Sequence, residues 1–367
     1  MLNPMTESDL ADAVRTAAGP LRVTGGGTRP LGKPVTGQVL SVSGISGISL
    51  YEPGALTIVA GAGTPVAEVE AVLAAEGQAL PFEPMDHQRL LGTDGTPTIG
   101  GVVAANVSGP RRVQAGACRD SLIGVRFVDG EGRIVKNGGR VMKNVTGYDL
   151  VKLMAGAYGT LGVLSEVSFK VLPKSGARAT LVADGLSADA AVRAMARALS
   201  SPFEVSGAAF HSGAGRAWIR VEGLEASVNY RAGRLVELLS DEAGWMRSQE
   251  DVWADIRDVA YLADEPGDVW RLSVKASDAA DIVARAEAED ALFDWGGGLV
   301  WLRVAEGTDL RARLGSYDGH AMLIRASEET RATTAVFEPE PAPLRALADG
   351  LRRQFDPKGI LNPGLMG

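Results

Sequence analysis

Hydrophobic and polar residues alternate along the chain in two spacings. One has a period of two, which is typical of strands, and the other has a period near 3.6, which is typical of helices. Residues 57–61 (TIVAG) form a β-branched strand pattern, and residues 66–76 (VAEVEAVLAAE) form a helical pattern that Gly77 can end. Thr64 and Pro65 lie between them, where an N-cap and a first helical residue are expected. This segment predicts a strand, a tight turn and a helix.

Similar segments follow one another over the whole chain. We expect a helix at 6–18, strands at 21–27, 39–45 and 159–173, and a hairpin at 121–139. Beyond Lys174 we expect helices at 187–201, 225–243 and 276–289, a strand-turn-strand at 208–223, and strands at 268–276, 296–305 and 320–327. A last helix and a glycine-proline turn are expected at 344–364. The sequence shows no repeat of 20–50 residues.

The length of 367 residues exceeds what a single hydrophobic core usually holds, about 250–300 residues. With 46% hydrophobic residues the chain can form two cores, and the change of pattern near Lys174 marks the expected boundary. The 46 glycines punctuate the apolar segments without a fixed period, which is typical of a turn-rich α/β or α+β protein.

Charge and cysteine content exclude several classes of function. The net charge is −8 and the sequence pI is about 5.1, so a basic face for nucleic acid is not expected. Cys118 is the only cysteine, which excludes an internal disulfide and a cysteine-held cluster. The sequence has neither a secretory signal pattern nor an apolar run of about 18 residues. We therefore expect a soluble cytoplasmic protein, and docking on a membrane-bound partner stays open.

A glycine run, Gly25-Gly26-Gly27, follows the apolar segment at 21–24 and ends in Thr28. Successive backbone N–H groups in such a turn can form a nest for an anion, and the Thr28 hydroxyl adds a donor. The missing Cβ atoms let a pyrophosphate lie against the main chain. An ordinary loop without a ligand is the alternative at this point.

Two further glycine-rich segments carry unequal weight. Residues 61–66 (GAGTPV) resemble the start of a dinucleotide-binding fingerprint, but Val66 replaces its third glycine and the later acidic residue is missing, so a tight strand-to-helix turn is the better interpretation. Residues 95–110 (GTPTIGGVVAANVSGP) are more specific. They place the hydroxyls of Thr96 and Thr98 beside a glycine pair that lets the chain approach a flat or charged ligand. A buried helix packed through small residues is the alternative.

Metal-dependent and hydrolytic chemistry are not expected. The histidines His87, His211 and His320 are far apart in the sequence and form no i,i+4 pair, so solitary histidines are favoured over a zinc site. The sequence has no Gly-x-Ser-x-Gly elbow, and Cys118 has no evident partner for nucleophilic catalysis.

Four segments, in this order, resemble a known family. They are GGGT at 25–28, TIGGVVAANVSG at 98–109, KNVTGYDLVKLMAGAYGTLGVLSEV at 143–167 and FDPKGILNPG at 355–364. As a set they resemble the vanillyl-alcohol-oxidase (PCMH) type of FAD-binding flavoprotein. The run VMKNVTGYDLVKLMAGAYGTLGV and the chain length are similar to the smaller FAD-binding subunit, the E subunit, of bacterial glycolate oxidases. Residues 175–335 agree only in size and pattern.

The resemblance implies an α+β fold in three parts. An FAD-binding domain of two α+β subdomains would occupy residues 1–174, an α+β cap domain residues 175–335, and a C-terminal segment at 336–367 would return to the FAD domain. FAD would lie between the two subdomains under the cap. Thr28 stands where families with covalent flavin often have histidine, so non-covalent FAD is expected.

The resemblance also implies which residues contact FAD. The pyrophosphate would be held by Gly25, Gly26, Gly27 and Thr28. The ribityl-to-adenine region would be lined by Glu83, Pro84, Thr96 and Thr98. The residues that pass along the cofactor would be Gly100, Gly101, Asn106, Ser108 and Gly109. The adenine end would be approached by Gly159, Thr160, Gly162 and Val163, and the flavin would be reached from the cap side by Asn362.

The implied activity is FAD-dependent oxidation of a CH–OH donor, glycolate to glyoxylate. It would take place in a complex with a larger FAD-binding subunit and an iron–sulfur subunit that receives the electrons. Related D-2-hydroxyacid dehydrogenases carry a histidine cluster that this sequence lacks, so the catalytic residues stay unassigned. Two alternatives stay open: a non-catalytic subunit for assembly or electron relay, and a stand-alone FAD oxidoreductase for another hydroxy acid or alcohol.

A carboxylate substrate favours an arginine clamp, because guanidinium binds carboxylate bidentately. The candidates on expected strands of residues 175–335 are Arg271, Lys275, Arg303 and Arg325. Solvated strand charges are the alternative for all four. His320 is the candidate base by its ordinary pKa, although nothing in the sequence directs it toward a flavin.

Overall fold

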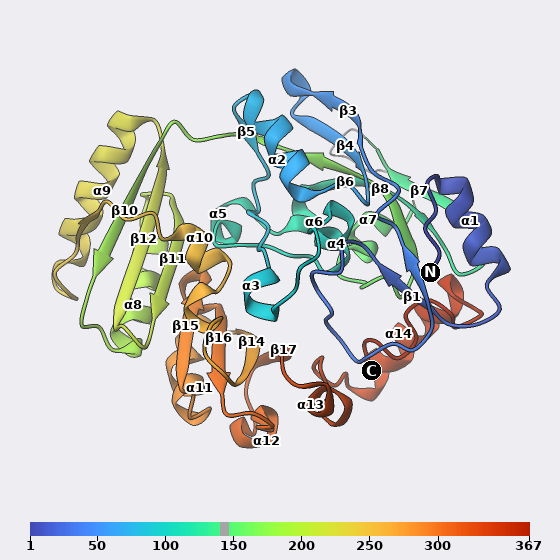
Figure 1. The fold of residues 1–367 in the computed structure, drawn as a ribbon. Helices are drawn as coiled ribbons and strands as arrows, with labels where there is room; N and C mark the ends of the chain where they lie inside the picture. Colours follow the sequence, from blue (N-terminus) through green and yellow to red (C-terminus); the bar gives the residue numbers. More distant parts are fainter. Residues whose placement is uncertain (140–146) are drawn as a thin grey trace.

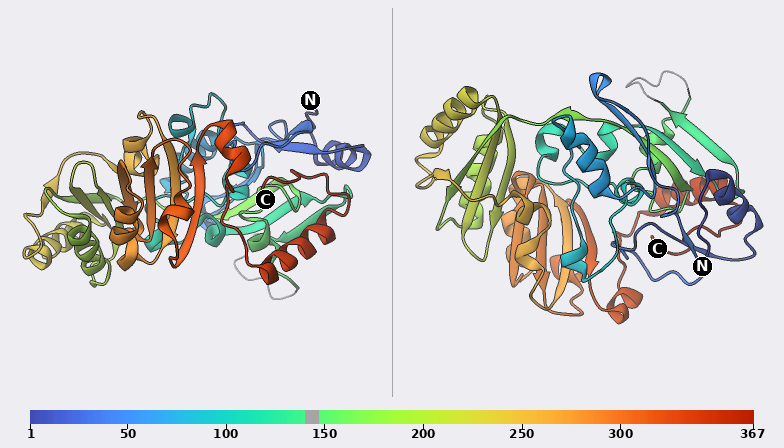
Figure 2. Two further views of the ribbon diagram at one scale, coloured as in Figure 1. Left: turned by 90° about the horizontal axis from the view of Figure 1, so that it is seen from below. Right: turned by 45° about the horizontal axis from the view of Figure 1, so that its top comes forward.

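The structure is a computed structural model that describes residues 1–139 and 147–367. Figures 1 and 2 show an N-terminal part (blue to green), a large second sheet (yellow-green to orange) beside it, and a last helix (red) that returns to the N-terminal part. One segment of the family resemblance, 143–167, includes residues 143–146, which lie outside the described residues.

A five-stranded antiparallel sheet forms the larger half of the N-terminal part. Its strands lie in the order β3 (Ile48–Glu52), β4 (Thr57–Gly61), β8 (Val163–Lys170), β6 (Leu122–Val128) and β7 (Ile134–Gly138). β6 and β7 form the expected hairpin, in which the amide of Asp129 donates to the carbonyl of Arg133 (3.1 Å). A short pair of β5 (Gln78–Ala79) and β9 (Leu172–Pro173) extends this half.

A smaller unit forms around two parallel strands, β1 (Leu21–Thr24) and β2 (Gln38–Ser41). Helix α1 (Glu7–Thr16) begins at a capping box in which Thr6 accepts from the amide of Asp9. Its buried face packs with Leu21 and Leu40 in one small core. The tail joins the same core, because Leu361 pairs with Leu21 in a parallel bridge.

Short helices connect the two units. They are α2 (Val66–Ala75), α3 (Gln88–Leu91), α4 (Ile99–Ala104), α5 (Arg112–Ala115), α6 (Cys118–Ser121) and α7 (Leu150–Met154), with a 3-10 turn η1 (Pro53–Ala55). The expected N-cap of α2 was wrong. The Thr64 hydroxyl donates back to the carbonyl of Gly61 (2.7 Å), and Pro65 precedes the first helical residue without a side-chain cap. The expected tight strand-to-helix turn therefore begins at Gly61 and is stabilised by Thr64.

The second sheet has eight strands among the described residues, and all of their pairings are antiparallel. Their order is β13 (Met246–Ser248), β10 (Ala177–Ala183), β12 (Arg216–Gly223), β11 (Val205–His211), β15 (Asp290–Asp294), β16 (Leu299–Val304), β14 (Asp268–Val274) and β17 (Gly319–Arg325). Its helices are α8 (Ala188–Leu199), α9 (Glu225–Leu239), α10 (Trp253–Arg257), α11 (Ala279–Arg285) and α12 (Leu310–Leu314), with 3-10 turns η2 (Ala260–Leu262), η3 (Ala276–Asp278) and η4 (Trp295–Gly297).

This sheet is a duplication. The segments β10-α8-β11-β12-α9-β13 and β14-α11-β15-β16-α12-β17 have the same β-α-β-β-α-β order, and each folds with the same strand arrangement. The two units join edge to edge through β11 and β15, where Phe210 lies opposite Phe293 and His211 opposite Leu292. The repeat lies in the topology, so the absence of a short sequence period does not contradict it.

The two faces of the sheet are covered differently. One face forms a core with the helices α8, α9, α11 and α12. The opposite face of the β14–β17 unit shares a core with the N-terminal part, to which it contributes Trp301, Met322 and Ile324. The same face of the β10–β13 unit packs against α10. The second sheet therefore presents only one of its two units to the N-terminal part through this shared core.

A buried ion pair also joins the two parts. Arg220 on β12 is 1% exposed, and both of its terminal nitrogens donate to the carboxylate of Glu83 at 2.9 Å. Ser206 accepts from the same guanidinium, and the ring of Trp253 lies 4.5 Å from it. Such bidentate contacts fix orientation as well as distance.

The chain after the second sheet returns to the N-terminal part. Helix α13 (Glu328–Thr333) follows β17, and α14 (Ala342–Phe355) runs along the N-terminal part, where Phe355 contacts Phe127. The architecture agrees with the α+β class that the sequence predicts. The domain limits at 174 and 335 remain a proposal, since the strands of the second sheet span 177–325.

Candidate functional site

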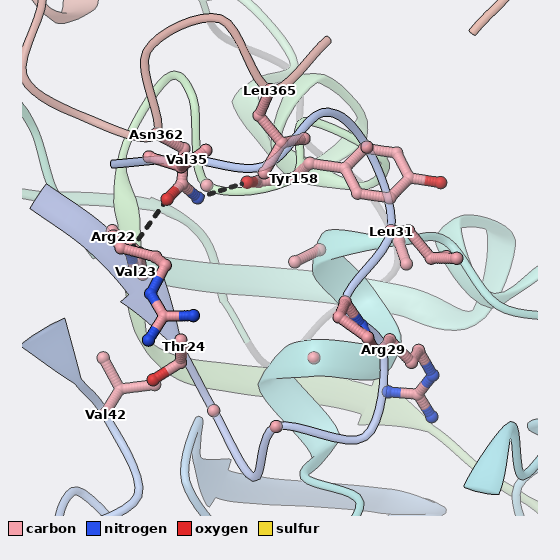
Figure 3. Close-up of a pocket in the computed structure, with 18 of the residues that line it drawn as sticks. Arg22, Val23, Thr24, Arg29, Leu31, Val35, Val42, Tyr158, Asn362 and Leu365 are labelled. Carbon is pink, nitrogen blue, oxygen red and sulfur yellow. Dashed lines mark hydrogen bonds between the residues drawn. The ribbon is translucent and has the colours of Figure 1, made fainter. Parts of the chain in front are cut away.

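An elongated cavity of about 330 Å³ lies in the N-terminal part, within the range of about 300–1,000 Å³ that is usual for ligand pockets. Figure 3 shows that β1, the loop that follows it, the loop at Tyr158 and the tail surround this cavity. Of the predicted contact residues, those that line it are Gly25, Gly26, Gly27, Thr28, Thr98, Gly100, Gly101, Gly159, Gly162, Val163 and Asn362. Segments from both ends of the sequence thus form one wall.

The glycine loop offers a row of hydrogen-bond donors. Among the residues that the structure describes, the amides of Gly25, Gly26, Gly27 and Thr28 donate to no other protein group. Gly27 has φ +75°, a left-handed conformation, and a Cβ placed there would meet no described atom within 4 Å. A row of unpaired amides with an open side suits a phosphate group.

Gly26 has a different role from its neighbour. A Cβ on Gly26 would lie 1.6 Å from the carbonyl oxygen of Thr96, and a Cβ on Gly95 would lie 1.8 Å from the carbonyl oxygen of Gly26. The two loops therefore pack backbone against backbone, and Thr96 contributes to this contact instead of to the cavity wall. Gly26 is needed for the shape of the loop whether or not a ligand is present.

Helix α4 forms the floor of the cavity. Thr98 caps it by accepting from the amide of Gly101 (3.4 Å). Gly100 approaches β4 so closely that a Cβ would lie 2.6 Å from Ala62, while Gly101 faces the Arg29 guanidinium. The predicted glycine pair is therefore explained by one close packing contact and one contact with a cavity-lining side chain.

Arg29 is a cavity residue that sequence reasoning missed. Its Nε donates to Nδ1 of His87 (3.2 Å) and its Nη2 to the carbonyl of Met85 (3.3 Å). Burial lowers the pKa of Arg29 to about 10, although Asp86 opposes this shift. Burial, followed by the Arg29 cation, lowers the pKa of His87 well below its ordinary value, so His87 is a neutral acceptor. The sequence feature that could have indicated Arg29 is its position directly after Thr28, the last residue of the predicted loop.

Asn362 connects three distant segments. Its Oδ1 accepts from the amide of Val23 and its Nδ2 donates to the carbonyl of Tyr158, both at 2.8 Å, as the dashed lines in Figure 3 show. Asn362 itself has φ +44° and is 3% exposed. Both of its polar atoms hold the cavity wall together. Asn362 also lines the cavity, and its predicted contact with a flavin stays a prediction.

Seven predicted contact residues do not line the cavity: Glu83, Pro84, Thr96, Asn106, Ser108, Gly109 and Thr160. Glu83 is bound to Arg220, as described above. The side chains of Asn106 and Ser108 accept from the amides of Arg119 (3.1 Å) and Cys118 (2.9 Å). These polar side chains therefore have structural contacts within the protein, and their predicted contact with a cofactor stays a prediction.

The four candidate cations of the second sheet have different surroundings. Arg303 bonds to the carboxylate of Glu289 and the carbonyl of Pro266, and Arg325 donates to three carbonyls of residues 263–267. Lys275 is 71% exposed and lies 4.0 Å from Asp278. Arg271 lies on the sheet face that meets the N-terminal part, opposite Met322 in the register, and its guanidinium has no hydrogen bond or ion pair among the described residues.

Within the described ranges, 1–139 and 147–367, no group of three or more histidine, cysteine or acidic residues could hold a metal ion. Partial burial, followed by the Arg271 cation, lowers the pKa of His320. In the same ranges, the structure has no helix long and apolar enough to cross a membrane.

The residues present fit FAD as a ligand. The free amides from Gly25 to Thr28 suit its diphosphate, and the cavity continues from them past α4 to Tyr158. The lining also includes two residues of α13, Glu328 and Arg331, and Arg331 donates to the carbonyl of Pro30 (2.7 Å).

Comparison with known proteins agrees with this fit. A family model described as an FAD binding domain matches residues 1–138. The glycolate oxidase subunit GlcE of Escherichia coli (strain K12) is 39% identical over 352 residues, which cover 95% of this chain and 92% of that protein. The glycolate oxidase subunit GlcD of Bacillus subtilis (strain 168) is 32% identical over 156 residues, 42% of this chain and 30% of that protein.

A solved structure extends the similarity to the second sheet. Alkyldihydroxyacetonephosphate synthase superposes with a TM-score of 0.71 over 98% of this chain and 76% of its own chain, at 15% sequence identity. At that identity the match shows the fold alone. It covers the whole architecture, including the part for which the sequence resemblance is limited to size and pattern.

Proposed function

The chain belongs to the family of glycolate oxidase subunits that includes GlcE of Escherichia coli, and on that premise we propose that it binds FAD non-covalently as a subunit of a glycolate-oxidising complex. It is an FAD-dependent oxidoreductase that acts on CH–OH donors. The observation that carries the FAD assignment is the row of unpaired amides from Gly25 to Thr28 at the cavity.

When bound, FAD supplies the hydride acceptor for alcohol oxidation, and the protein supplies position and charge. The glycine loop would hold the diphosphate. Arg29 would place a buried positive charge on the cavity wall, and Tyr158 would close the end that faces the second sheet. Asn362 would act indirectly, because it fixes the strand and the loop that form this wall.

The partners are a larger FAD-binding subunit and an iron–sulfur subunit. This chain has one cysteine, Cys118, which is fully buried, and burial raises the pKa of its thiol. A cysteine-held cluster must therefore lie on another chain. The proposed location is the cytoplasm, with membrane association through the complex.

A relay role for this subunit is the second candidate, and one observation favours it. The described residues include no cluster that could hold a metal, whereas related hydroxyacid dehydrogenases use a histidine cluster to handle metal and hydroxyl proton. In that case the larger subunit oxidises glycolate and this flavin passes electrons on.

The first experiment follows the flavin absorbance. The purified chain, loaded with FAD, receives glycolate without oxygen, first alone and then with the larger subunit. We expect bound FAD in both samples and bleaching at least in the second. Bleaching of the chain alone would assign substrate oxidation to it. Failure to bind FAD, or no bleaching in either sample, would contradict the proposal.

A further inference from the structure

We propose that Arg112 and Arg271 form a binding site for a small carboxylate anion between the N-terminal part and the second sheet, with the indole of Trp295 as a shared wall. The binding site itself rests on the geometry below. Its assignment to a 2-hydroxy acid rests on the proposed function.

Arg271 lies between two apolar cross-strand neighbours in the second sheet. In the register, Arg271 on β14 lies opposite Trp301 on β16 and opposite Met322 on β17. Both neighbours belong to the core that the sheet shares with the N-terminal part. A guanidinium at such a position is costly unless it finds an anionic partner.

Neither arginine has such a partner among residues 1–139 and 147–367. In the part of the chain that the structure describes, the guanidinium groups of Arg112 and Arg271 form no hydrogen bond and no ion pair. They lie instead over the Trp295 ring, at 4.3 Å and 5.4 Å from its centroid, and Arg271 also lies 5.8 Å from the Trp301 ring. Aromatic faces stabilise a cation but leave its N–H donors unused.

Both parts of the molecule hold Trp295 in place. Its indole N–H donates to the carbonyl of Gly109 in the N-terminal part (3.0 Å), and its amide donates to Oδ1 of Asp294 (2.7 Å). Trp295 has φ +53°, which its two anchors stabilise. The Trp295 ring is therefore fixed in position. Arg112 contacts it from the N-terminal part, and Arg271 contacts it from the second sheet.

The surroundings select a small anion. Burial lowers the pKa of Arg271, and the nearby Arg112 cation lowers it further, while the Tyr158 and Asp294 side chains oppose the shift. The Tyr158 hydroxyl lies 3.8 Å from Sδ of Met322, which is the cross-strand neighbour of Arg271. His320 lies two residues from Met322 on the same strand, and its pKa responds to both arginines. The planar guanidinium groups of Arg112 and Arg271 lie near the same Trp295 ring. They suit a carboxylate, because a carboxylate binds guanidinium bidentately.

The site adjoins the FAD cavity. Tyr158 lines that cavity and also contacts Met322, the cross-strand neighbour of Arg271. A carboxylate held by the two arginines would therefore lie at the end of the cavity that faces the second sheet.

The test uses oxalate, a planar carboxylate that cannot be oxidised as an alcohol, and the FAD-loaded full chain. Calorimetry measures its binding, and the flavin absorbance band reports an anion nearby. We expect oxalate to bind the native chain and to perturb the band. R271Q and R112Q should each weaken binding about 30-fold or more, because each leaves the anion without one charged partner. R271K keeps the charge, loses the planar fork and should bind with intermediate affinity.

The matched control is R247Q, which removes an exposed arginine from the opposite edge of the same sheet. It should bind oxalate as the native chain does, and circular dichroism should show that every variant is folded. The proposal is overturned if oxalate does not bind the folded native chain, or if R271Q or the conservative R271K binds it unchanged. Oxalate binding that needs both arginines, without bleaching by glycolate in any sample, would keep the site and reject the proposed function. Oxidation of glycolate, together with oxalate binding that is unchanged in R271Q, would keep the proposed function and reject the site.

Discussion

Two neighbouring glycines have different roles in the loop that lines the cavity. Gly26 is required by a backbone contact with Thr96, so substitutions there change the loop whether or not FAD binds. Gly27 has a left-handed backbone and an open side. Only Gly27 can therefore test the contact with a diphosphate separately from the packing of the loop.

We predict that Gly27→Asp abolishes FAD retention. Aspartate tolerates a left-handed backbone, and its carboxylate would repel a diphosphate at the free amides. The control is Gly77→Asp, because Gly77 also has a left-handed backbone with no described atom within 4 Å of its Cβ position and does not line the cavity. FAD content after gel filtration measures both. Equal FAD content in the two variants would reject the assignment of the loop.

The sequence identified contiguous parts of the site and missed contributions from single side chains. The motif residues from Gly25 to Thr28 lie together because they are consecutive on one turn. Arg29 and Tyr158 line the same cavity, but sequence reasoning included neither in the predicted site. Glu83 is predicted to contact the cofactor, and the structure pairs it with Arg220, 137 residues away, which the sequence did not indicate. Such pairs depend on the packing of two sheets, which local patterns do not reveal.

At the scale of elements, the turn after β15 combines several unusual features. Its residues Trp295, Gly296 and Gly297 all have positive φ, and Asp294 is buried at its start. Burial raises the pKa of Asp294 to about 7, with the amide of Trp295 and the Arg220 cation opposing the shift. This turn sets the position of the ring that contacts both Arg112 and Arg271.

We predict that this carboxyl group makes folding less favourable as pH rises. The folded chain binds its proton up to pH of about 7, whereas an unfolded chain releases it near its ordinary pKa of about 3.9. The folded state therefore holds more protons between these values, and the free energy of unfolding falls as pH rises through this window. Asp294→Asn keeps an oxygen acceptor for the Trp295 amide and removes the titration.

Urea unfolding at pH 5 and pH 7 measures this effect. The loss of unfolding free energy between the two should be smaller in Asp294→Asn than in the native chain. Asp241→Asn, at an exposed position on the same part of the molecule, should leave the loss unchanged. Parallel pH curves for Asp294→Asn and the native chain would show that Asp294 is not protonated in the folded state.

Elements of ten or more residues were easier to predict than short ones. The long helices α8 and α9 have clear apolar faces, and both begin within one residue of the expected positions. Helices α3 and α5 have four residues each and are determined by the loops around them. The expected cap at Thr64 failed because its hydroxyl oxygen accepts from the amide of Gly47 (2.9 Å) and donates to the carbonyl of Gly61, and it accepts from no amide of α2.

At the scale of the whole molecule, the C-terminal tail at residues 361–365 forms part of the cavity wall. Leu365 lines the cavity, and its carbonyl accepts from the amide of Lys33 (3.0 Å). Leu361 pairs with β1, and Asn362 bonds to β1 and to the loop at Tyr158. The expectation that the tail returns to the FAD-binding part agrees with these contacts.

We predict that Asn362→Leu weakens FAD retention and destabilises the fold by about 2–6 kcal/mol, because it leaves two backbone groups without partners at about 1–3 kcal/mol each. Asn362→Asp keeps the acceptor for the Val23 amide and should have an intermediate effect. Asn229→Leu, at an exposed position on α9, is the control. Thermal melting with and without FAD measures the effect, and native-like melting of Asn362→Leu would contradict it.

The duplication within the second sheet could not be predicted from the sequence, because it also depends on the packing of distant segments. Its two units share an order of elements and a strand arrangement, while the residues on their inner faces differ. Arg271, Trp301 and Met322 face the N-terminal part in one unit, whereas Trp218 faces α10 in the other. The two units have the same topology but different side chains, so the amino-acid sequence shows no repeat.

The cavity wall combines segments that are far apart in the sequence, so they are synthesised at different times. Gly27 is synthesised long before Asn362, because the whole second sheet lies between them in the sequence. A ribosome that adds about 5–20 residues per second needs roughly 20–70 s for the residues between them. Throughout that time the strand at Val23 lacks the side chain that accepts from its amide. A nascent chain that has not reached Asn362 therefore cannot complete the cavity around the flavin.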